Sequence, residues 1–264
     1  MATLRSRESF VFDGAECRKM FDATQKRDEN LVSRYLTAKE VVVQSGYARE
    51  IDWQEQRRLE NVTESSFLLE CAWVILNSGM RESVVRQRFP LVTRAFLNWS
   101  SASEILGQQQ ACRRRAIAAF GHIPKIDAIV RTAGMLVENG IDKIKRRIKV
   151  VGVPALLQFP FIGPVTAWHL AKNIGLDVAK PDRHLCRISE IAGFSSPSEM
   201  CKLIARHVGD RLSVVDVVLW RFATLQHNYL KFFNIQLSER NDDVQLDSWE
   251  GPTHRGQRKL RLCA

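Results

Sequence analysis

The chain has 264 residues, enough for one large domain or two smaller units with a sizeable hydrophobic core. Hydrophobic residues make up 45% of it, with only 14 Gly and 8 Pro, which excludes a collagen-like or low-complexity protein. The net charge of +10 favours a polyanionic partner, although a basic protein without any nucleic-acid role remains an alternative on charge alone.

No apolar run is long enough to span a membrane, and the first residues lack the apolar centre of a signal peptide. We therefore expect an intracellular, cytoplasmic protein without membrane contact, associated with the nucleoid if the source is bacterial. The six cysteines form no Cys-x-x-Cys pair, so we predict free thiols and no zinc knuckle.

Residues 1–60 are predicted to form an N-terminal helical extension. Residues 1–30 are charged and mixed in pattern, which suits a short helix or a loose arm. From Leu31 to Gln44 the apolar residues recur at near-helical spacing, and Ser45-Gly46 then breaks the helix.

The main unit is predicted to span residues 61–237 and to begin with a buried helix. Thr63 is a suitable N-cap, and Phe67–Asn77 is apolar nearly all round, which is typical of a buried helix. Glu70 lies inside this run and must find a partner or have a raised pKa. The helix is expected to end at Ser78-Gly79.

Residues 84–148 are predicted to form three or four amphipathic helices. Ser103 is a candidate N-cap for a short one, and Gly121 and Asn139-Gly140 are stop signals. Between Arg113 and Lys149 there are ten Lys or Arg and three acidic residues. Such a run is usually a solvated face, but it also suits contact with phosphates.

The most informative segment is Leu156–His184. Pro160 ends an apolar segment, Gly163 provides a tight turn, and Pro164 suits the first turn of the next helix. A helix that begins after such a turn presents unpaired N–H groups and a partial positive charge, which together favour a phosphate.

Further helices are predicted around His184–Ile188, Ser198–Val208 and Val214–Gln226. No stretch alternates long enough to indicate a strand, so the predicted fold class is all-α. Residues 238–264 are polar, and their last ten residues hold four basic groups and no acidic one, which predicts a basic tail.

The segment from Phe159 to Ala167 resembles the hairpin of the helix-hairpin-helix/Gly-Pro-Asp superfamily of DNA glycosylases. The family pattern is roughly Leu-Pro-Gly-Val-Gly-x-x-Thr-Ala, followed about twenty residues later by a catalytic Asp. Asp182 follows Gly163 by 19 residues here, inside Pro181-Asp182-Arg183-His184. The resemblance extends over about residues 64–233 and departs from the family at Phe161, where a Gly is usual.

This resemblance implies a two-lobed helical fold that binds double-stranded DNA across a cleft, and we expect a monomer. A glycosylase flips the target nucleotide out of the stack. Asp182 would then stabilise the positive charge on the sugar and activate water. Bifunctional relatives use a Lys at the position of Val165, so a monofunctional enzyme that leaves an abasic site is expected.

The resemblance also assigns the remaining site residues. The DNA-binding set comprises Phe161, Ile162, Gly163, Val165, Thr166, Lys180, Arg183 and His184. Gly79 and Met80 occupy the loop from which relatives intercalate, with a plain helix end as the alternative. The candidate base pocket comprises Trp53, Glu70, Trp73 and Trp168, although each ring also suits core packing and Glu70 an internal ion pair.

The iron–sulfur cluster of some relatives is not expected, because it needs four cysteines and only Cys186, Cys201 and Cys263 lie beyond Asp182. No metal or cofactor is expected to be required, and a monovalent cation at the hairpin carbonyls is optional. An alkylated purine is the first substrate candidate. The alternatives are a hypermodified base of foreign DNA and a non-catalytic DNA-binding protein, in which Asp182 would be only a helix cap or ion-pair partner.

Overall fold

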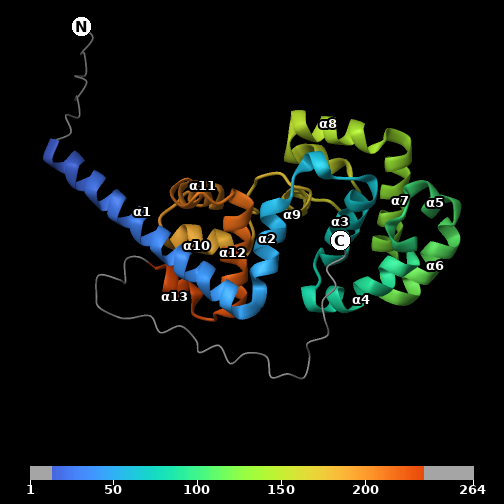
Figure 1. The fold of residues 1–264 in the computed structure, drawn as a ribbon, viewed down its shortest axis with the longest axis horizontal. Helices are drawn as coiled ribbons and strands as arrows, with labels where there is room; N and C mark the ends of the chain where they lie inside the picture. The colour runs from blue at the N-terminus through green and yellow to red at the C-terminus, as the bar shows by residue number, and fades with distance from the viewer. Residues whose placement is uncertain (1–13, 235–264) are drawn as a thin grey trace, which may run out of the picture.

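A computed structural model describes residues 14–234, which form helices and connecting turns (Figure 1). The described residues contain no strand, so the predicted all-α class is confirmed. Residues 1–13 and the predicted tail at 238–264 lie outside the described part of the chain. Within residues 14–234, no helix is both long and apolar enough to cross a membrane.

The helices enclose two separate hydrophobic cores, with α9 between the two groups of helices (Figure 1). The first core is formed by η2 (Leu59–Asn61), α3 (Glu64–Asn77), α4 (Glu82–Ala95), η3 (Leu97–Trp99), α5 (Ala102–Gly107), α6 (Gln109–Phe120), α7 (Ile123–Asn139), α8 (Ile141–Val151), η4 (Val153–Gln158) and α9 (Pro164–Asn173). The second core is formed by α1 (Gly14–Val42), α2 (Ala48–Gln56), α10 (Arg183–Ile191), α11 (Pro197–Val208), α12 (Leu212–Leu225) and α13 (Tyr229–Phe233), and the π-helical turn η1 (Val43–Tyr47) joins α1 to α2.

The N-terminal helices, predicted as a helical extension, share the second core with the C-terminal helices. Leu31, Tyr35 and Ala38 are fully buried in the second core, whose other members are Val42, Ile51 and residues from Ala179 onward. The Tyr35 hydroxyl also donates to Asp210 at 2.5 Å. The apolar stripe of α1 therefore finds its complement in the C-terminal helices, and the helix starts at Gly14 rather than near Leu31.

Local signals in the sequence fix several helix ends. The Thr63 hydroxyl accepts from the Ser66 N–H at 3.2 Å, so the predicted N-cap of α3 is confirmed. Gly121 and Gly140 follow α6 and α7 with φ of 80° and 71°, as the stop signals predicted. The predicted cap of α5 is wrong, because its N-cap is Ser101 rather than Ser103.

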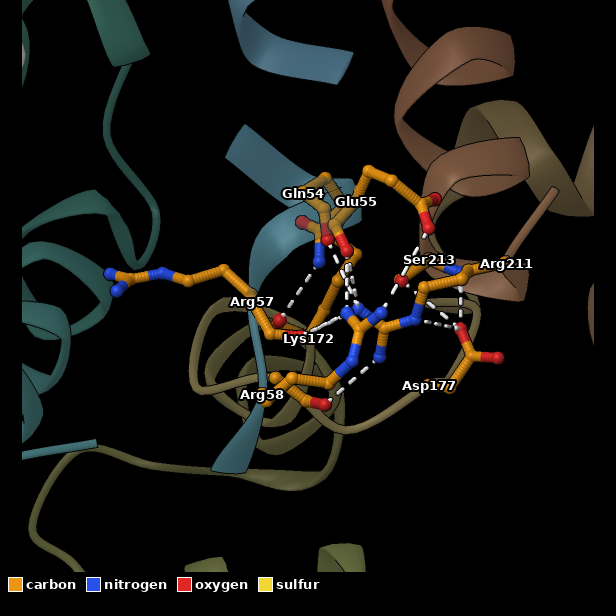
Figure 2. Close-up of polar contacts among 9 residues, drawn as sticks. Gln54, Glu55, Arg57, Arg58, Lys172, Asp177, Arg211 and Ser213 are labelled. Atoms are coloured by element: carbon orange, nitrogen blue, oxygen red, sulfur yellow. Dashed lines mark hydrogen bonds and ion pairs between the residues drawn. The ribbon is translucent and has the colours of Figure 1, made fainter. Parts of the chain in front are cut away.

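The junction between the two groups of helices is held by Arg211 at the start of α12 (Figure 2). Its guanidinium donates to the carbonyl oxygens of Gln54 at 3.1 Å, Arg57 at 2.6 Å and Gly175 at 3.1 Å. These carbonyls belong to the end of α2 and to the turn that follows α9. One cation thus fixes three segments that are far apart in the sequence, and the Gln54 amide adds a bond to the Lys172 carbonyl.

Candidate functional site

The turn before α9 has the geometry of an anion site. Gly163 is the N-cap of α9, Pro164 is the first helical residue, and the N–H groups of Val165 and Thr166 have no acceptor within residues 14–234. These two groups lie at the positive end of the helix dipole. The Gly163 N–H itself is not available, because it donates to the Thr166 hydroxyl at 2.7 Å.

Phe161 occupies a backbone conformation that normally favours glycine. Its φ is 61°, in the left-handed region, where a residue with a side chain is strained by about 1–2 kcal/mol. Its ring packs edge-on against His122, with centroids 6.4 Å apart, and still leaves 39% of the residue exposed. Phe161 therefore takes a backbone conformation that glycine would adopt without strain.

The loop after α3 lies beside this turn. An open depression of about 470 Å³ is lined by Ser78 and by residues 161–166. Lys125 from α7 holds the loop in place by donating to the carbonyl oxygens of Leu76 at 2.8 Å and Ser78 at 2.5 Å. Two segments about eighty residues apart in the sequence therefore form one surface.

The apolar side chains on this surface differ from the expected ones. Gly79 is exposed with φ of 69°, but Met80 is half-buried and packs against the first core. Phe161 and Val165, by contrast, are 39% and 49% exposed. Ile162, expected to bind DNA, is buried in the first core. The apolar groups that this surface presents to a partner are therefore Phe161 and Val165.

Asp182 is the N-cap of α10. Its Oδ1 accepts from the N–H groups of His184 at 2.9 Å and Leu185 at 3.1 Å. The other oxygen, Oδ2, lies 3.5 Å from the Lys180 ammonium. The Arg183 side chain beside it is exposed. Asp182 thus has one oxygen engaged by the helix and the other beside the Lys180 ammonium, and its side chain is 13% exposed.

His184 is oriented by a partner from α13. Its Nδ1 lies 3.0 Å from the Tyr229 hydroxyl, and its Nε2 lies 3.4 Å from the Arg183 Nε that donates to it. Burial lowers the pKa of His184, so its neutral form is favoured. A neutral ring that accepts at Nε2 carries its proton on Nδ1, which then donates to Tyr229.

A buried carboxylate joins the Asp182 loop, defined here as residues 175–182, to α9. Asp216 on α12 forms an ion pair with the Lys172 ammonium and accepts from the Lys180 N–H at 2.6 Å. Burial raises the pKa of Asp216, and the Lys172 cation acts against that rise. The helix of the hairpin and the loop that carries Asp182 are consequently held by the same side chain.

His169 belongs to this region although the sequence analysis did not select it. It lies four residues after Val165 on α9, and burial, together with Lys180 and Lys172, holds the pKa of its imidazole well below the usual range. The i, i+4 spacing from Val165 is the signal in the sequence that would have indicated a shared face.

Glu70 is used inside the protein. Its Oε1 accepts from Arg57 at 2.8 Å and its Oε2 accepts from the Asn173 amide at 2.9 Å. Burial raises the pKa of Glu70, and Arg57 and Asn173 oppose the shift. The Arg57 guanidinium also lies 4.5 Å from the centroid of the Trp53 ring. Of the two expected roles of Glu70, the structure shows the internal ion pair, and it places a cation of the protein over Trp53.

The other two tryptophans of the predicted base pocket make separate contacts. Trp73 packs edge-on against Phe89 at 5.1 Å and lies 5.7 Å from the Arg86 guanidinium. Trp168 packs against the first core. Among the residues that the structure describes, no ring contact joins any two of these three tryptophans. The role of Trp53, Trp73 and Trp168 in a base pocket therefore stays a prediction.

In comparisons with known proteins, no family model, curated protein or solved structure matches the chain. Residues 14–234 also contain no group of three or more His, Cys, Asp or Glu side chains that could hold a metal ion.

Proposed function

We propose that the protein is a monofunctional DNA glycosylase with a two-lobed helix-hairpin-helix fold, which flips a modified base out of the duplex and hydrolyses its N-glycosidic bond. The observation that carries this proposal is the joint anchoring of α9 and the Asp182 loop on Asp216. A phosphate-binding turn and a catalytic carboxylate can act on one nucleotide only if the distance between them is fixed. Asp216 would fix it by bonding to both α9 and the Asp182 loop.

In the proposed reaction the bond between C1′ of the sugar and the base nitrogen breaks, and its electron pair leaves with the base. Asp182 Oδ2 stabilises the positive charge that develops on the sugar. A water oxygen bonds to C1′ and gives its proton to Asp182, which then releases it to solvent; a base that leaves as an anion takes a proton from solvent, and a cationic alkylated base leaves neutral without one. The products are the free base and an intact strand with an abasic site.

A release assay tests this function. Duplexes with alkylated, oxidised, deaminated or hypermodified bases are incubated with excess protein, and any freed base is identified by mass. We expect release of a base from at least one duplex. Binding to duplex DNA without release from any member of such a panel would contradict the enzymatic proposal.

The panel must be broad because of the contacts at Trp53. An alkylated purine is a good cationic leaving group, and a cage of aromatic rings would suit it. However, the Trp53 ring already faces the Arg57 guanidinium, which also forms an ion pair with Glu70. Oxidised, deaminated and hypermodified bases therefore belong in the panel beside alkylated purines.

A non-catalytic DNA-binding module is the second candidate. The observation that favours it is the position of Asp182, which caps α10 and lies beside Lys180, as a purely structural Asp would. The two candidates share the hairpin and its phosphate contacts, and they differ only in whether base release depends on Asp182.

Substitution of Gly163 tests the phosphate contact. An added Cβ would lie 3.9 Å from the Thr166 hydroxyl oxygen, an ordinary contact, and the φ of −97° suits alanine. We therefore expect Gly163→Ala to fold normally. Its Cβ would occupy the place where a phosphate should approach the turn, so every duplex should bind about tenfold more weakly, roughly the loss of one hydrogen bond to a charged group. Fluorescence anisotropy with several unrelated duplexes measures this loss.

The control is Gly107→Ala, where an added Cβ meets nothing within 4 Å. It should bind like the wild type. Phosphate contacts carry no base information, so a Gly163→Ala defect confined to one sequence or one lesion would show that this turn does not hold the backbone.

The absence of a nucleophilic Lys in the first turn of α9 can be tested by trapping. Val165 occupies that position, and Lys172 is buried in its ion pair with Asp216. We expect borohydride to trap no covalent complex on any DNA from which the protein releases a base. A trapped complex that disappears in Lys180→Ala would show that Lys180, which lies beside Asp182, acts as the nucleophile.

A further inference from the structure

Helix α8 presents a cationic face that the proposed site does not use. Lys143, Arg146 and Arg147 are exposed, and none of them pairs with an acidic group within residues 14–234. The opposite face of α8 is fixed to the protein, because Ile144 and Ile148 are buried in the first core. The three cations therefore point away from the core.

This face lies at the far end of the first core from the hairpin. Helix α7 begins beside Phe161, where the His122 ring packs, and its 17 residues span about 25 Å before α8 starts. Helix α3 gives a second estimate of the distance between the two surfaces. Lys145 of α8 donates to the Val62 carbonyl just before α3, whereas Ser78 at its other end lines the hairpin depression, about 21 Å away.

The separation and direction of the two surfaces limit what one ligand can do. They occupy opposite ends of α3 and α7, and Figure 1 shows α8 at one edge of the molecule and the junction of α3 with α4 at the other. A duplex held at the hairpin would have to follow α3 or α7 for more than about 20 Å to reach the outward face of α8.

The face suits the phosphate backbone of a duplex better than a lipid surface. Lys143 and Arg147 are separated by about 6 Å of helical rise, and phosphates on one strand recur about every 3.4 Å of rise, so the pair can meet phosphates two positions apart. A lipid-inserted helix needs a broad apolar face, but Ile144 and Ile148 of α8 point inward, and its exposed apolar side chains are Val150 and Val151 at the C-terminal end.

We infer that the outward face of α8 is a second duplex-binding surface, with which the protein holds two DNA segments at once. It recognises the phosphate backbone without reading bases, because flexible cations on one helix face provide charge but no fixed pattern of donors. The inference rests on the proposed function in one respect, that the hairpin holds the first duplex.

A bridging experiment tests this surface. A biotinylated duplex of about 15 base pairs, roughly 50 Å long, is immobilised, loaded with protein, and exposed to a second, fluorescent duplex of unmodified DNA. The test variant is Lys143→Gln/Arg147→Gln. The matched control is Lys202→Gln/Arg206→Gln on α11, which removes two exposed cations at the same i, i+4 spacing and changes the net charge equally.

We expect the α8 variant to bind the first duplex within twofold of the wild type but to capture the second at least tenfold more weakly. The slope of the logarithm of the capture constant against the logarithm of salt concentration should become shallower by about 1.8, the value for two lost phosphate contacts. The control variant should retain both activities. Weaker binding of the first duplex by the α8 variant would place α8 in the primary footprint and overturn the inference.

The remaining outcomes separate this inference from the proposed function. A wild-type protein that binds one duplex through Gly163 but never captures a second would refute the α8 surface alone, and binding to no duplex at all would refute both. Vesicles with phosphatidylserine and an acidic peptide serve as rival probes. Loss of binding to either probe in the α8 variant, with duplex capture unchanged, would assign the face to that other partner.

Discussion

Asp182→Asn should lose base release by about 10²–10⁴-fold while it still folds and binds DNA. Asparagine is as good an N-cap as aspartate, so the N–H groups of His184 and Leu185 keep an acceptor and α10 keeps its start. The substitution removes only the negative charge that the proposed reaction needs near the sugar. Single-turnover release on the duplex selected by the panel measures the effect.

The structure offers two comparisons for this variant. Asp182→Ala removes the cap as well, and should lose a further 0.5–2 kcal/mol or so of stability relative to Asp182→Asn. Asp177→Asn is the matched control, because Asp177 lies in the same loop and accepts from the Ser213 N–H and hydroxyl, both at 3.0 Å. It should release base normally. Near-normal release by Asp182→Asn would show that Asp182 is only a helix cap.

Gly175→Ala should be the most destabilising small substitution in the junction, at a cost on the order of 3 kcal/mol in the free energy of unfolding. The φ of Gly175 is 96°, and an added Cβ would lie 2.6–2.7 Å from three backbone atoms of Arg58. No rotamer change can relieve a clash with backbone atoms. The turn after α9 would have to move away from the segment that follows α2, and the Arg211 bond to the Gly175 carbonyl would be lost.

Urea unfolding followed by circular dichroism measures this cost. The control is Gly134→Ala, on α7, where an added Cβ meets nothing within 4 Å. Alanine is the better helix former, so this variant should be stabilised by about 0.5–1 kcal/mol. A Gly175→Ala protein as stable as the wild type would show that the close packing of the two chain segments is not required for the fold.

The sequence by itself determined those features whose cause lies within a few residues. The N-cap at Thr63, the buried α3, the start of α9 at Pro164 and the ends of α6 and α7 all depend on a side chain or a φ angle at that position. The 19-residue spacing from Gly163 to Asp182 is likewise present in the sequence, although its catalytic meaning remains a proposal.

Only the tertiary structure decided which distant residues meet, because burial and pairing depend on contacts that no local pattern records. The stripe on α1 did not reveal that its partners lie beyond Ala179, so the first helices were predicted as an extension. Glu70 gave no sign that Arg57 and Asn173 would engage both its oxygens. Lys172 and Asp216 are 44 residues apart, and only the fold turns them into the pair that ties the hairpin helix to the Asp182 loop.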